Sequence, residues 1–508
     1  MLIAAIVSRT TGQEQAGDQS HHNTEPHSHA FSPRVCGAFM TLDALRLEVP
    51  DILEEDSDAT SNLAAVLQES RRHSLLEGLQ KTLGTLFRLN RCALTLLERQ
   101  RALQSLTEEY RHYSQMIRHE KAPPTLFVHF CTELAAGFKR LLLQILHGRK
   151  PSRPHLAWCL YMAQHFLAQA LLRHYQQYQQ PPGVLWRDSH LLYWVGEHQE
   201  CLDEPVAAAF DPTPAGTLRG LYQQILLLAL SNPFHLTEGE APQLFSALAP
   251  LAALGRLHVW DDEEQEGYLV DLGADLPCIG HEQIGEVPPE QLRRLELGAL
   301  LIALHDPAPL RKVDQDILLE RVRHHWLGHH PRRHERTEQT GTCRLIVGLG
   351  AIQQHLLSPD TEGGCDAGIL DVSAGGARIN CAGNRANQFP VGQLLLILNN
   401  NGTPTLAVVR WRHLNNDGLH LGLRYLKGLP RPVWLRRAPD AQRHPGVLQS
   451  TPEPGNGWYH GLWLPQGHFV EGENLWLQLA SFDNQTILPL PTANLSTPLV
   501  SRHPLRLV

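Results

Sequence analysis

The chain has 508 residues, 42% of them hydrophobic, and this length predicts about three domains, each with a core of its own. Its formal net charge of −8 argues against a general nucleic-acid-binding protein, because such proteins concentrate positive charge on one surface. Thirty-eight arginines stand against six lysines, but this excess is spread along the whole chain and is typical of a coding bias.

The nine cysteines are scattered between Cys36 and Cys381, and no two of them form a C-x-x-C pair. This pattern is typical of reduced thiols in a cytosolic protein rather than of a disulfide framework or a zinc ribbon. No apolar run reaches the ~20 residues that cross a bilayer, and the apolar start at Met1–Val7 is too short for a signal peptide. We therefore expect a cytoplasmic protein without membrane insertion.

Residues 1–39 combine four histidines with Gly, Ser, Asn and Pro and contain nothing that could pack a core. This composition predicts a disordered tail. A metal-binding tract is the alternative, although the spacing alone does not preorganise ligands. The sequence also allows translation to start at Met40. The histidines concerned are His21, His22, His27 and His29.

From residue 60 to 230 the sequence has a helical period. Leucines and phenylalanines between Leu75 and Phe87 recur at intervals of three and four, as an amphipathic helix requires. Proline and glycine separate the successive apolar stripes, so we expect an array of helices. If pairs of these helices repeat, the array would be a solenoid. The further predicted helices are Leu94–Tyr113, Leu126–Leu146, Leu156–Tyr178 and Leu218–Leu230.

Residues 231–327 form a mixed segment. A helix is predicted at Ala241–Leu254, followed by strands at Arg256–Trp260 and Gly267–Leu272 on either side of an acidic turn. This order would also suit a winged helix-turn-helix. An acidic hairpin tip would repel a phosphate backbone, and the second helix lacks side chains that read bases, so DNA binding is disfavoured. Two more helices are predicted at Pro289–His305 and Asp314–Trp326.

Beyond Thr340 the sequence changes to short strands separated by turn residues, which is typical of an antiparallel barrel. We place the barrel at residues 328–428 and a β-rich extension at 429–508. The extension begins with a proline-rich connection near Pro430–Pro454. The predicted strands are Cys343–Leu349, Gly368–Asp371, Ala377–Cys381, Leu394–Leu398, Thr405–His413 and Leu419–Leu426 in the barrel, and Trp458–Leu464 and Leu475–Leu479 in the extension.

Two motifs lie beside these strands: the first comes just before the first strand, and the second closes the strand Gly368–Asp371 and opens a turn. Arg332 and Arg336 form R-x-x-x-R with Arg333 beside them, and D-x-S-x-x-G occurs at Asp371, Ser373 and Gly376. Guanidinium groups bind phosphates and purine edges through paired, charge-assisted hydrogen bonds. Each motif alone is weak, because the first recurs by chance in an arginine-rich chain and the second describes an ordinary tight turn. Their combination, in this order around a strand, is far more specific.

In this combination the sequence resembles the PilZ domains. Trp411 and the Gly422–Tyr425 stretch are similar to the closing strands of that family. The resemblance implies a six-stranded β-barrel that binds the bacterial second messenger cyclic di-GMP. It also implies that the arginines wrap around the ligand and that the D-x-S-x-x-G turn meets a guanine. The ligand-binding residues implied are Arg332, Arg333, Arg336, Asp371, Ser373 and Gly376.

One departure from the family is the long segment between the two motifs, Ala351–Gly368, which includes a predicted helical turn at Ala351–Leu357. Just before the arginines lie His324, His325, His329 and His330. A pair at i and i+4 could share a metal on a helix, but Gly328 interrupts that helix, so a polar helix end is the favoured interpretation.

No Walker A, H-E-x-x-H, G-x-S-x-G or Rossmann glycine motif occurs, so we expect neither an enzyme nor a cofactor. The resemblance implies a cyclic-di-GMP effector with α+β multidomain architecture. Ligand binding would order the arginine segment and change the conformation that the helical region presents to a protein partner. The alternative is a scaffold or adaptor whose PilZ-like barrel does not bind nucleotide.

Overall fold

The computed structural model describes thirteen stretches of the chain, and the predicted histidine-rich tail at 1–39 lies outside them. They are residues 45–53, 60–116, 124–148, 152–207, 216–261, 267–280, 287–305, 313–327, 334–359, 363–399, 404–452, 458–480 and 485–505. The fold divides into two compact units. The first takes Met1–Arg173, Pro181–Leu230 and Phe245–Asp316; the second takes His174–Gln180, Ser231–Leu244 and Ile317–Val508.

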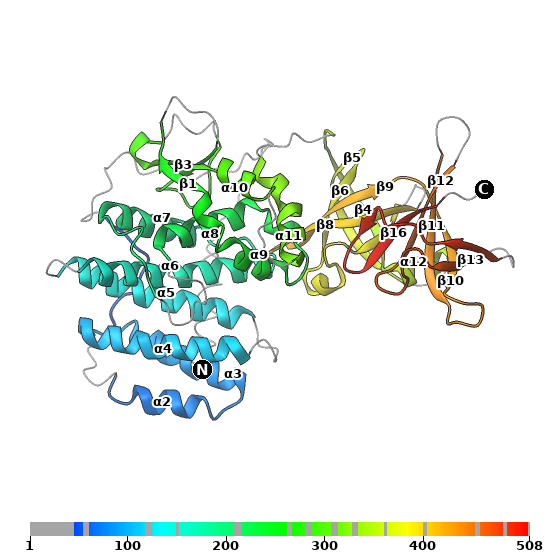
Figure 1. Cartoon of the computed structure of the whole chain (residues 1–508). Helices are drawn as coiled ribbons and strands as arrows, with labels where there is room; N and C mark the ends of the chain where they lie inside the picture. The colour runs from blue at the N-terminus through cyan, green and yellow to red at the C-terminus, as the bar shows by residue number, and fades with distance from the viewer. Residues whose placement is uncertain are drawn as a thin grey trace, which may run out of the picture. The chain divides into compact units, whose positions relative to one another are not determined.

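The predicted helical region is confirmed. Helices α3 to α7 lie one above another in Figure 1, and neighbouring helices in this stack pack against each other. The helices from residue 63 to 248 are α2 (Leu63–Ser70), α3 (Leu75–Leu89), α4 (Leu96–Met116), α5 (Pro124–Leu146), α6 (Arg153–Gln176), α7 (Gly183–His198), α8 (Leu218–Leu230) and α9 (Glu240–Leu248). None of the helices that the structure describes combines the length and apolarity needed to span a bilayer.

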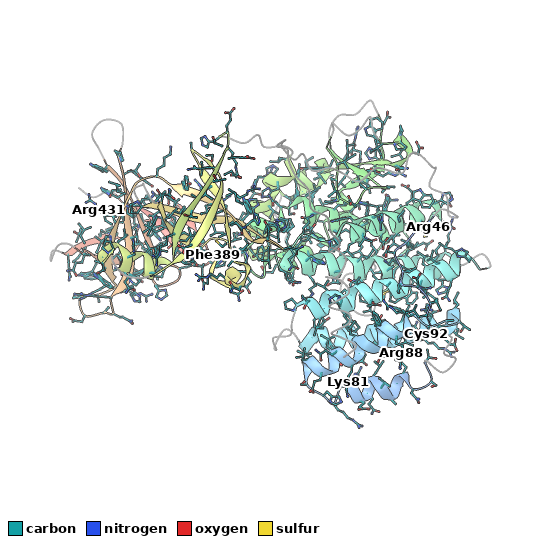
Figure 2. The ribbon with its side chains drawn as sticks, turned by 180° about the vertical axis from the view of Figure 1, so that it is seen from behind. Arg46, Lys81, Arg88, Cys92, Phe389 and Arg431 are labelled. Atoms are coloured by element: carbon teal, nitrogen blue, oxygen red, sulfur yellow. The ribbon has the colours of Figure 1, made fainter. Side chains whose placement is uncertain are left out.

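Two helix starts are set by short local hydrogen bonds. Before α4, the Thr95 amide donates to the Glu98 carboxylate at 2.9 Å, and the Glu98 amide donates to the Thr95 hydroxyl at 3.4 Å. This reciprocal pair is a capping box, which satisfies two amides that the helix itself cannot. Before α3, the Ser74 hydroxyl accepts from the Glu77 amide in the same way. Figure 2 labels Lys81 and Arg88 on α3 and Cys92 in the turn that follows it.

The helical core contains a buried ion pair. The Lys139 ammonium on α5 contacts the Asp188 carboxylate on α7, and the two side chains are 4% and 1% exposed. The Glu48 amide also donates to this carboxylate at 3.2 Å. Burial raises the pKa of Asp188, while Lys139 opposes that rise. The pair therefore joins α5, α7 and the chain near Glu48 at one point.

Several predictions for residues 231–327 are wrong. The strands β1 (Arg256–Val259) and β2 (Tyr268–Asp271) do not pair with each other, because β3 (Leu292–Glu296) lies between them. This third strand occupies the first half of the helix predicted at Pro289–His305, of which only α10 (Gly298–Ala303) forms an α-helix. The helix predicted at Ala241–Leu254 ends at Leu248 and gives way to a 3-10 turn. The acidic turn lies largely outside the described residues.

The strand β3 contains two buried arginines between its buried leucines, Leu292 and Leu295. Arg293 and Arg294 are 4% and 2% exposed. The Arg293 guanidinium forms an ion pair with Glu197 on α7, and Arg294 donates to the Asp261 carbonyl at 2.9 Å. A buried guanidinium is stable only with such partners. This pairing explains why an arginine-rich segment becomes the central strand of a small sheet.

The predicted six-stranded antiparallel barrel is confirmed, and it is closed. The strand order is β4-β5-β6-β9-β8-β7, and β7 pairs back onto β4. A helix, α12 (Leu349–Leu357), lies in the long segment after β4, where a helical turn was expected. The strands are β4 (Thr337–Val347), β5 (Cys365–Ser373), β6 (Gly376–Cys381), β7 (Leu394–Asn399), β8 (Thr405–Asn415) and β9 (Gly418–Leu426). Before them, α11 (Val313–Arg323) continues into a 3-10 turn at His324–Leu327.

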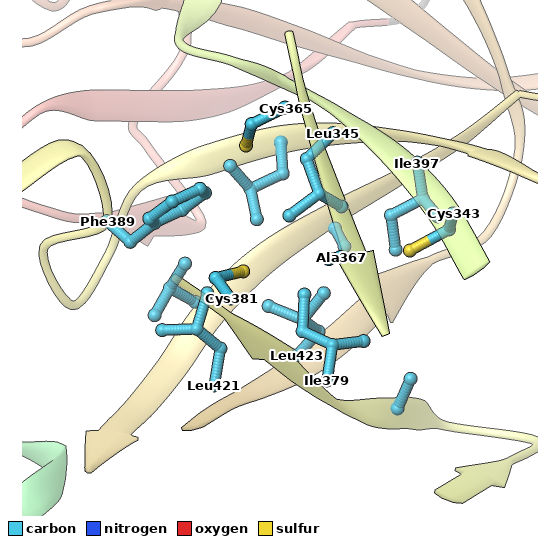
Figure 3. Packing of buried hydrophobic residues seen from close by; sticks show 14 of the residues in the cluster. Cys343, Leu345, Cys365, Ala367, Ile379, Cys381, Phe389, Ile397, Leu421 and Leu423 are labelled. Atoms are coloured by element: carbon cyan, nitrogen blue, oxygen red, sulfur yellow. The ribbon is translucent and has the colours of Figure 1, made fainter. Parts of the chain in front are cut away.

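The interior of the barrel is filled by small and branched apolar side chains. Phe389 follows a 3-10 turn and enters this core, where it is fully buried (Figures 2 and 3). Three cysteines, Cys343, Cys365 and Cys381, point into the same core in Figure 3. Burial raises the pKa of all three thiols, that of Cys381 to about 12, so they are protonated and pack as small hydrophobes. The eight described cysteines form no disulfide with one another.

The short segments of the second unit attach to strand β8. The Leu414 amide donates to the Tyr178 carbonyl at 2.8 Å, and the Arg412 guanidinium lies 4.1 Å from the centre of the Tyr178 ring. The Phe234 and His413 rings lie 4.6 Å apart. Residues that follow α6 and α8 are thereby fixed to the barrel.

The C-terminal extension is a seven-stranded sheet, and the prediction of a proline-rich connection at Pro430–Pro454 is wrong. That segment forms β10 (Leu429–Arg436) and β11 (His444–Pro452). The predicted strands in the extension are confirmed as β12 (Trp458–Pro465) and β13 (Asn474–Leu479), and β14 (Gln485–Pro489), β15 (Leu495–Ser496) and β16 (Val500–Leu505) complete the sheet. Trp463 and Val500 pack with α12 and the outer face of β7 and β8, so the sheet shares a core with the barrel.

Replacing Asp188 by Asn tests the buried ion pair. Because Lys139 would stay buried without a counter-charge, we expect the free energy of unfolding to fall by about 3–5 kcal/mol. Urea unfolding followed by circular dichroism measures this change. Glu200→Gln is the control: its pair with Arg153 is exposed, and its loss should cost at most about 1 kcal/mol. Equal losses in the two variants would contradict the role given to the buried pair.

Candidate functional site

The D-x-S-x-x-G motif forms the tight turn between β5 and β6. Ser373 and Gly376 are register partners at the end of the hairpin. The Gly375 amide donates to the Ser373 hydroxyl at 3.3 Å, and that hydroxyl donates to the Gly376 carbonyl at 3.3 Å. The serine therefore holds the shape of the turn through its own backbone neighbours, as serine does in many turns.

Gly376 is required by the close approach of strand β9. A Cβ atom at this position would lie 1.9 Å from the Leu423 carbonyl oxygen, a contact that backbone atoms would have to relieve. The next carbonyl back in the turn, that of Gly375, accepts from the Tyr425 amide at 2.9 Å. The glycine thus allows the turn to lie directly against the closing strand of the barrel.

Asp371 is the acceptor for two arginines. Arg336 Nη1 donates to Asp371 Oδ1 at 2.7 Å, and Arg378 Nε lies 3.1 Å from Oδ2. Asp371 is 8% exposed, whereas the Arg336 side chain is about a third exposed. Two guanidiniums share one carboxylate, so this edge of the barrel keeps a net positive charge among these three groups. Charge-assisted bonds of this kind are short and directional.

Arg336 reaches Asp371 because of the strand register. Arg336 immediately precedes β4, and at the start of that strand Glu338 is the partner of Asp371 on β5. Asp371 is in turn the register partner of Arg378 on β6. The end of the arginine motif and the start of the D-x-S-x-x-G motif are consequently neighbours on adjacent strands.

The same row continues around the outside of the barrel. Arg378 pairs with Gly422 on β9, and Gly422 pairs with Trp411 on β8. A Cβ atom at Gly422 would lie 1.9 Å from Trp411 Nε1, so the indole covers this glycine. An arginine and an indole are both groups on which a flat base can stack.

Of the predicted site residues, the structure brings together Arg336, Asp371, Ser373 and Gly376. Arg332 and Arg333 lie outside the described residues. Sequence reasoning missed Arg378 and also His334, whose ring lies against Gly375: a Cβ atom on that glycine would be 2.9 Å from His334 Cδ2. Arg378 could have been found, because Ala377 and Ile379 are core residues and alternation then turns Arg378 outward.

In class, the chain is a helical region joined to a closed six-stranded barrel with a polar, arginine-rich edge. Comparison with known families adds a more particular likeness. Residues 61–263 match the family model described as "Cyclic-di-GMP receptor FimW, N-terminal domain". The match runs from the start of α2 past β1 and ends before the barrel begins. No curated protein and no solved structure matches this chain.

Gly376→Ala tests the close approach at the turn. The added methyl group must displace the backbone of β9, so we expect the free energy of unfolding to fall by about 1–3 kcal/mol. Gly341→Ala is the matched control on β4, because there the nearest atom is 3.9 Å away, an ordinary contact. Urea unfolding of both variants gives the comparison. If Gly376→Ala is as stable as Gly341→Ala, the assigned constraint does not exist.

Proposed function

We propose that this protein is a cyclic-di-GMP-binding effector whose barrel is a PilZ domain. The observation that carries the proposal is the coincidence of two independent features. The helical region matches a family model whose description names a cyclic-di-GMP receptor. The barrel that follows carries the two motifs whose described members, Arg336 and Asp371, meet at 2.7 Å. We also propose the domain division into residues 60–230, 231–327, 328–428 and 429–508.

In this proposal each site residue has a chemical role. Asp371 accepts hydrogen bonds from guanine N1–H and N2–H₂, which are both donors on one edge of the base. The Ser373 hydroxyl can donate or accept a hydrogen bond. Gly376 has no side chain, so the base can come close to the backbone of the turn. Arg336, together with Arg332 and Arg333, binds phosphates through paired hydrogen bonds.

Binding would require Arg336 to exchange partners. Its guanidinium donates to Asp371, the carboxylate that is also proposed to read guanine. A phosphate offers Arg336 an equally good acceptor, and its departure leaves Asp371 Oδ1 open to the base. Arg378 stays beside Oδ2, 3.1 Å from its Nε, and holds the carboxylate in place. The exchange couples phosphate binding to base recognition.

In the sequence, the arginine segment, Arg332–Arg336, follows the His324–Leu327 turn after four residues. Trp326 in that turn is 2% exposed, and its Nε1 donates to the Ser231 hydroxyl at 3.1 Å. Arg321, one turn earlier, forms an ion pair with Glu240 on α9. A shift of the arginine segment would therefore act on Ser231–Leu244, which joins α8 to α9. We propose that this connection carries the signal to the helical region and its protein partner.

One observation favours the adaptor as a second candidate. Asp371 already has two arginine partners. In an adaptor, its role would be purely structural: it would hold the start of β4 and strand β6 to β5. In that case the barrel would be a scaffold, and partner binding would be independent of nucleotide.

Isothermal titration of the purified chain with cyclic di-GMP separates the two candidates. We expect saturable binding by the wild-type chain. The affinity should fall about ten-fold or more in Arg332→Ala, Arg336→Ala and Asp371→Asn, because each substitution removes a charge-assisted contact. GTP and cyclic AMP serve as ligand controls. Arg344→Ala is the matched protein control, because this exposed barrel arginine donates only to the Gly363 carbonyl among the described groups.

Binding that is unchanged in all three site variants would reject the site. No binding by the intact chain would reject the effector and favour the adaptor. Circular dichroism of each variant ensures that any loss reflects the site rather than unfolding.

A further inference from the structure

A pocket that Asp371 does not line is present in the barrel-containing unit. It has a volume of about 200 Å³ and lies between the segment 231–237, the end of α11, the outer face of β8 and β9, and the turn at 495–498. Three arginines and three histidines line it: Arg321, Arg410, Arg424, His235, His324 and His325. No carboxylate occurs among the described residues that line it.

The positive charge of this pocket is only partly compensated. Arg321 has Glu240 as its counter-charge. Arg410 and Arg424 form no ion pair or hydrogen bond with any described side chain. Burial lowers the pKa of Arg410, and the nearby Arg424 and Arg321 lower it further. Among the described groups, one carboxylate, paired with Arg321 alone, therefore balances three guanidiniums, an arrangement that an anion would stabilise.

Beside its apolar residues, the lining includes neutral groups that can form hydrogen bonds. Burial, reinforced by His325, Arg410 and His324, lowers the pKa of His235 to about 3, so this ring is neutral at physiological pH. Its Nδ1 is buried and has no hydrogen-bond partner among the described residues. Thr237 and Ser496, which carry hydroxyl groups, also line the pocket. A neutral imidazole and hydroxyl groups can donate to oxygens without adding charge.

We propose that this pocket binds the phosphate group of a small phosphomonoester. Several arginines together match the oxygens of a phosphate group in geometry and charge. A carboxylate ligand has fewer oxygens and less charge, so it would satisfy these guanidiniums less completely. The volume is below the ~300 Å³ at which pockets for drug-sized ligands begin, so the pocket suits a phosphate group and a short substituent rather than a dinucleotide. It also lacks the carboxylate acceptor by which guanine would be recognised.

The pocket differs in its lining from the site around Asp371 but lies next to it, because Arg424, which lines the pocket, is the register partner of Gly376. Neither Asp371, Arg336 nor Ser373 lines it. An anion bound there would connect three parts of the chain that meet at β8: the segment after α8, the end of α11 and the C-terminal extension. We therefore infer that phosphate binding stabilises the junction of these parts, independently of cyclic di-GMP.

Titration of the full chain in phosphate-free buffer tests the proposal, with inorganic phosphate and glycerol 3-phosphate as probes. We expect one binding site per chain and an affinity that falls at least ten-fold, roughly, in Arg410→Gln and in Arg424→Gln. Arg431→Gln is the matched control, since Arg431 is an exposed arginine on β10 (Figure 2) outside the pocket.

Absence of binding by the wild-type chain would overturn the proposal. So would binding that survives in both pocket variants, or binding that Arg431→Gln weakens as strongly, which would indicate general attraction of anions to arginine. Loss of binding in Arg336→Gln, which removes a proposed phosphate-binding guanidinium of the cyclic-di-GMP site, would assign the anion to that site instead. Because the probes contain no guanine, failure here leaves the effector proposal standing, and failure of cyclic-di-GMP binding leaves this pocket untouched.

Discussion

The carboxylate of Asp371 organises the edge of the barrel on which the proposed function depends. It is buried at the end of β5 and accepts from guanidiniums on two other elements, Arg336 before β4 and Arg378 on β6. One acceptor thus joins three neighbouring strands at the point where the chain enters the barrel. Because the carboxylate is shared, a ligand that offers a better acceptor to one arginine can change the position of the segment before β4 without unfolding the barrel.

This arrangement depends on the backbone around it. Gly376 lets the β5–β6 turn lie against Leu423, and Gly422 leaves room for the indole of Trp411. Inside, a core of alanine, cysteine and branched side chains closes the six strands around Phe389. Outside, α12 and the C-terminal sheet cover β7 and β8, which leaves the β4–β5–β6 edge with its polar groups. Closure of the barrel therefore fixes the positions of the proposed site residues, and covering one side of it leaves this edge open for the proposed ligand.

Periodicity and local turn chemistry were enough to predict most of this architecture. The apolar stripes at Leu75–Phe87 and in the following helices have a spacing that only a helix satisfies. Asp371-x-Ser373 predicts a turn, because the side chains of such residues form hydrogen bonds with nearby backbone groups. Strand β3 could not be predicted in the same way. In the sequence, Arg293 and Arg294 have the character of surface residues. The ion-pair partner that lets Arg293 be buried is Glu197, which lies almost a hundred positions earlier in the chain.

The prolines of β10 were misleading for a different reason. Pro430 and Pro432 have strand partners only on the β11 side, because pairing with β13 begins at Val433. Proline is tolerated where no neighbouring strand needs its missing amide, and this depends on register, which the sequence does not contain. The same limit applies to the site: the motifs named Arg336 and Asp371, but only the register shows that Arg378 completes their contact.

Hydrogen–deuterium exchange of the full chain, with and without cyclic di-GMP, tests the central claim most directly. If the ligand takes Arg336 from Asp371 and the effect passes through Trp326 to Ser231, exchange should slow in peptides covering residues 334–338, 371–378 and 231–244. Slower exchange at other places only, or no change on the barrel edge when the ligand is bound, would contradict the account.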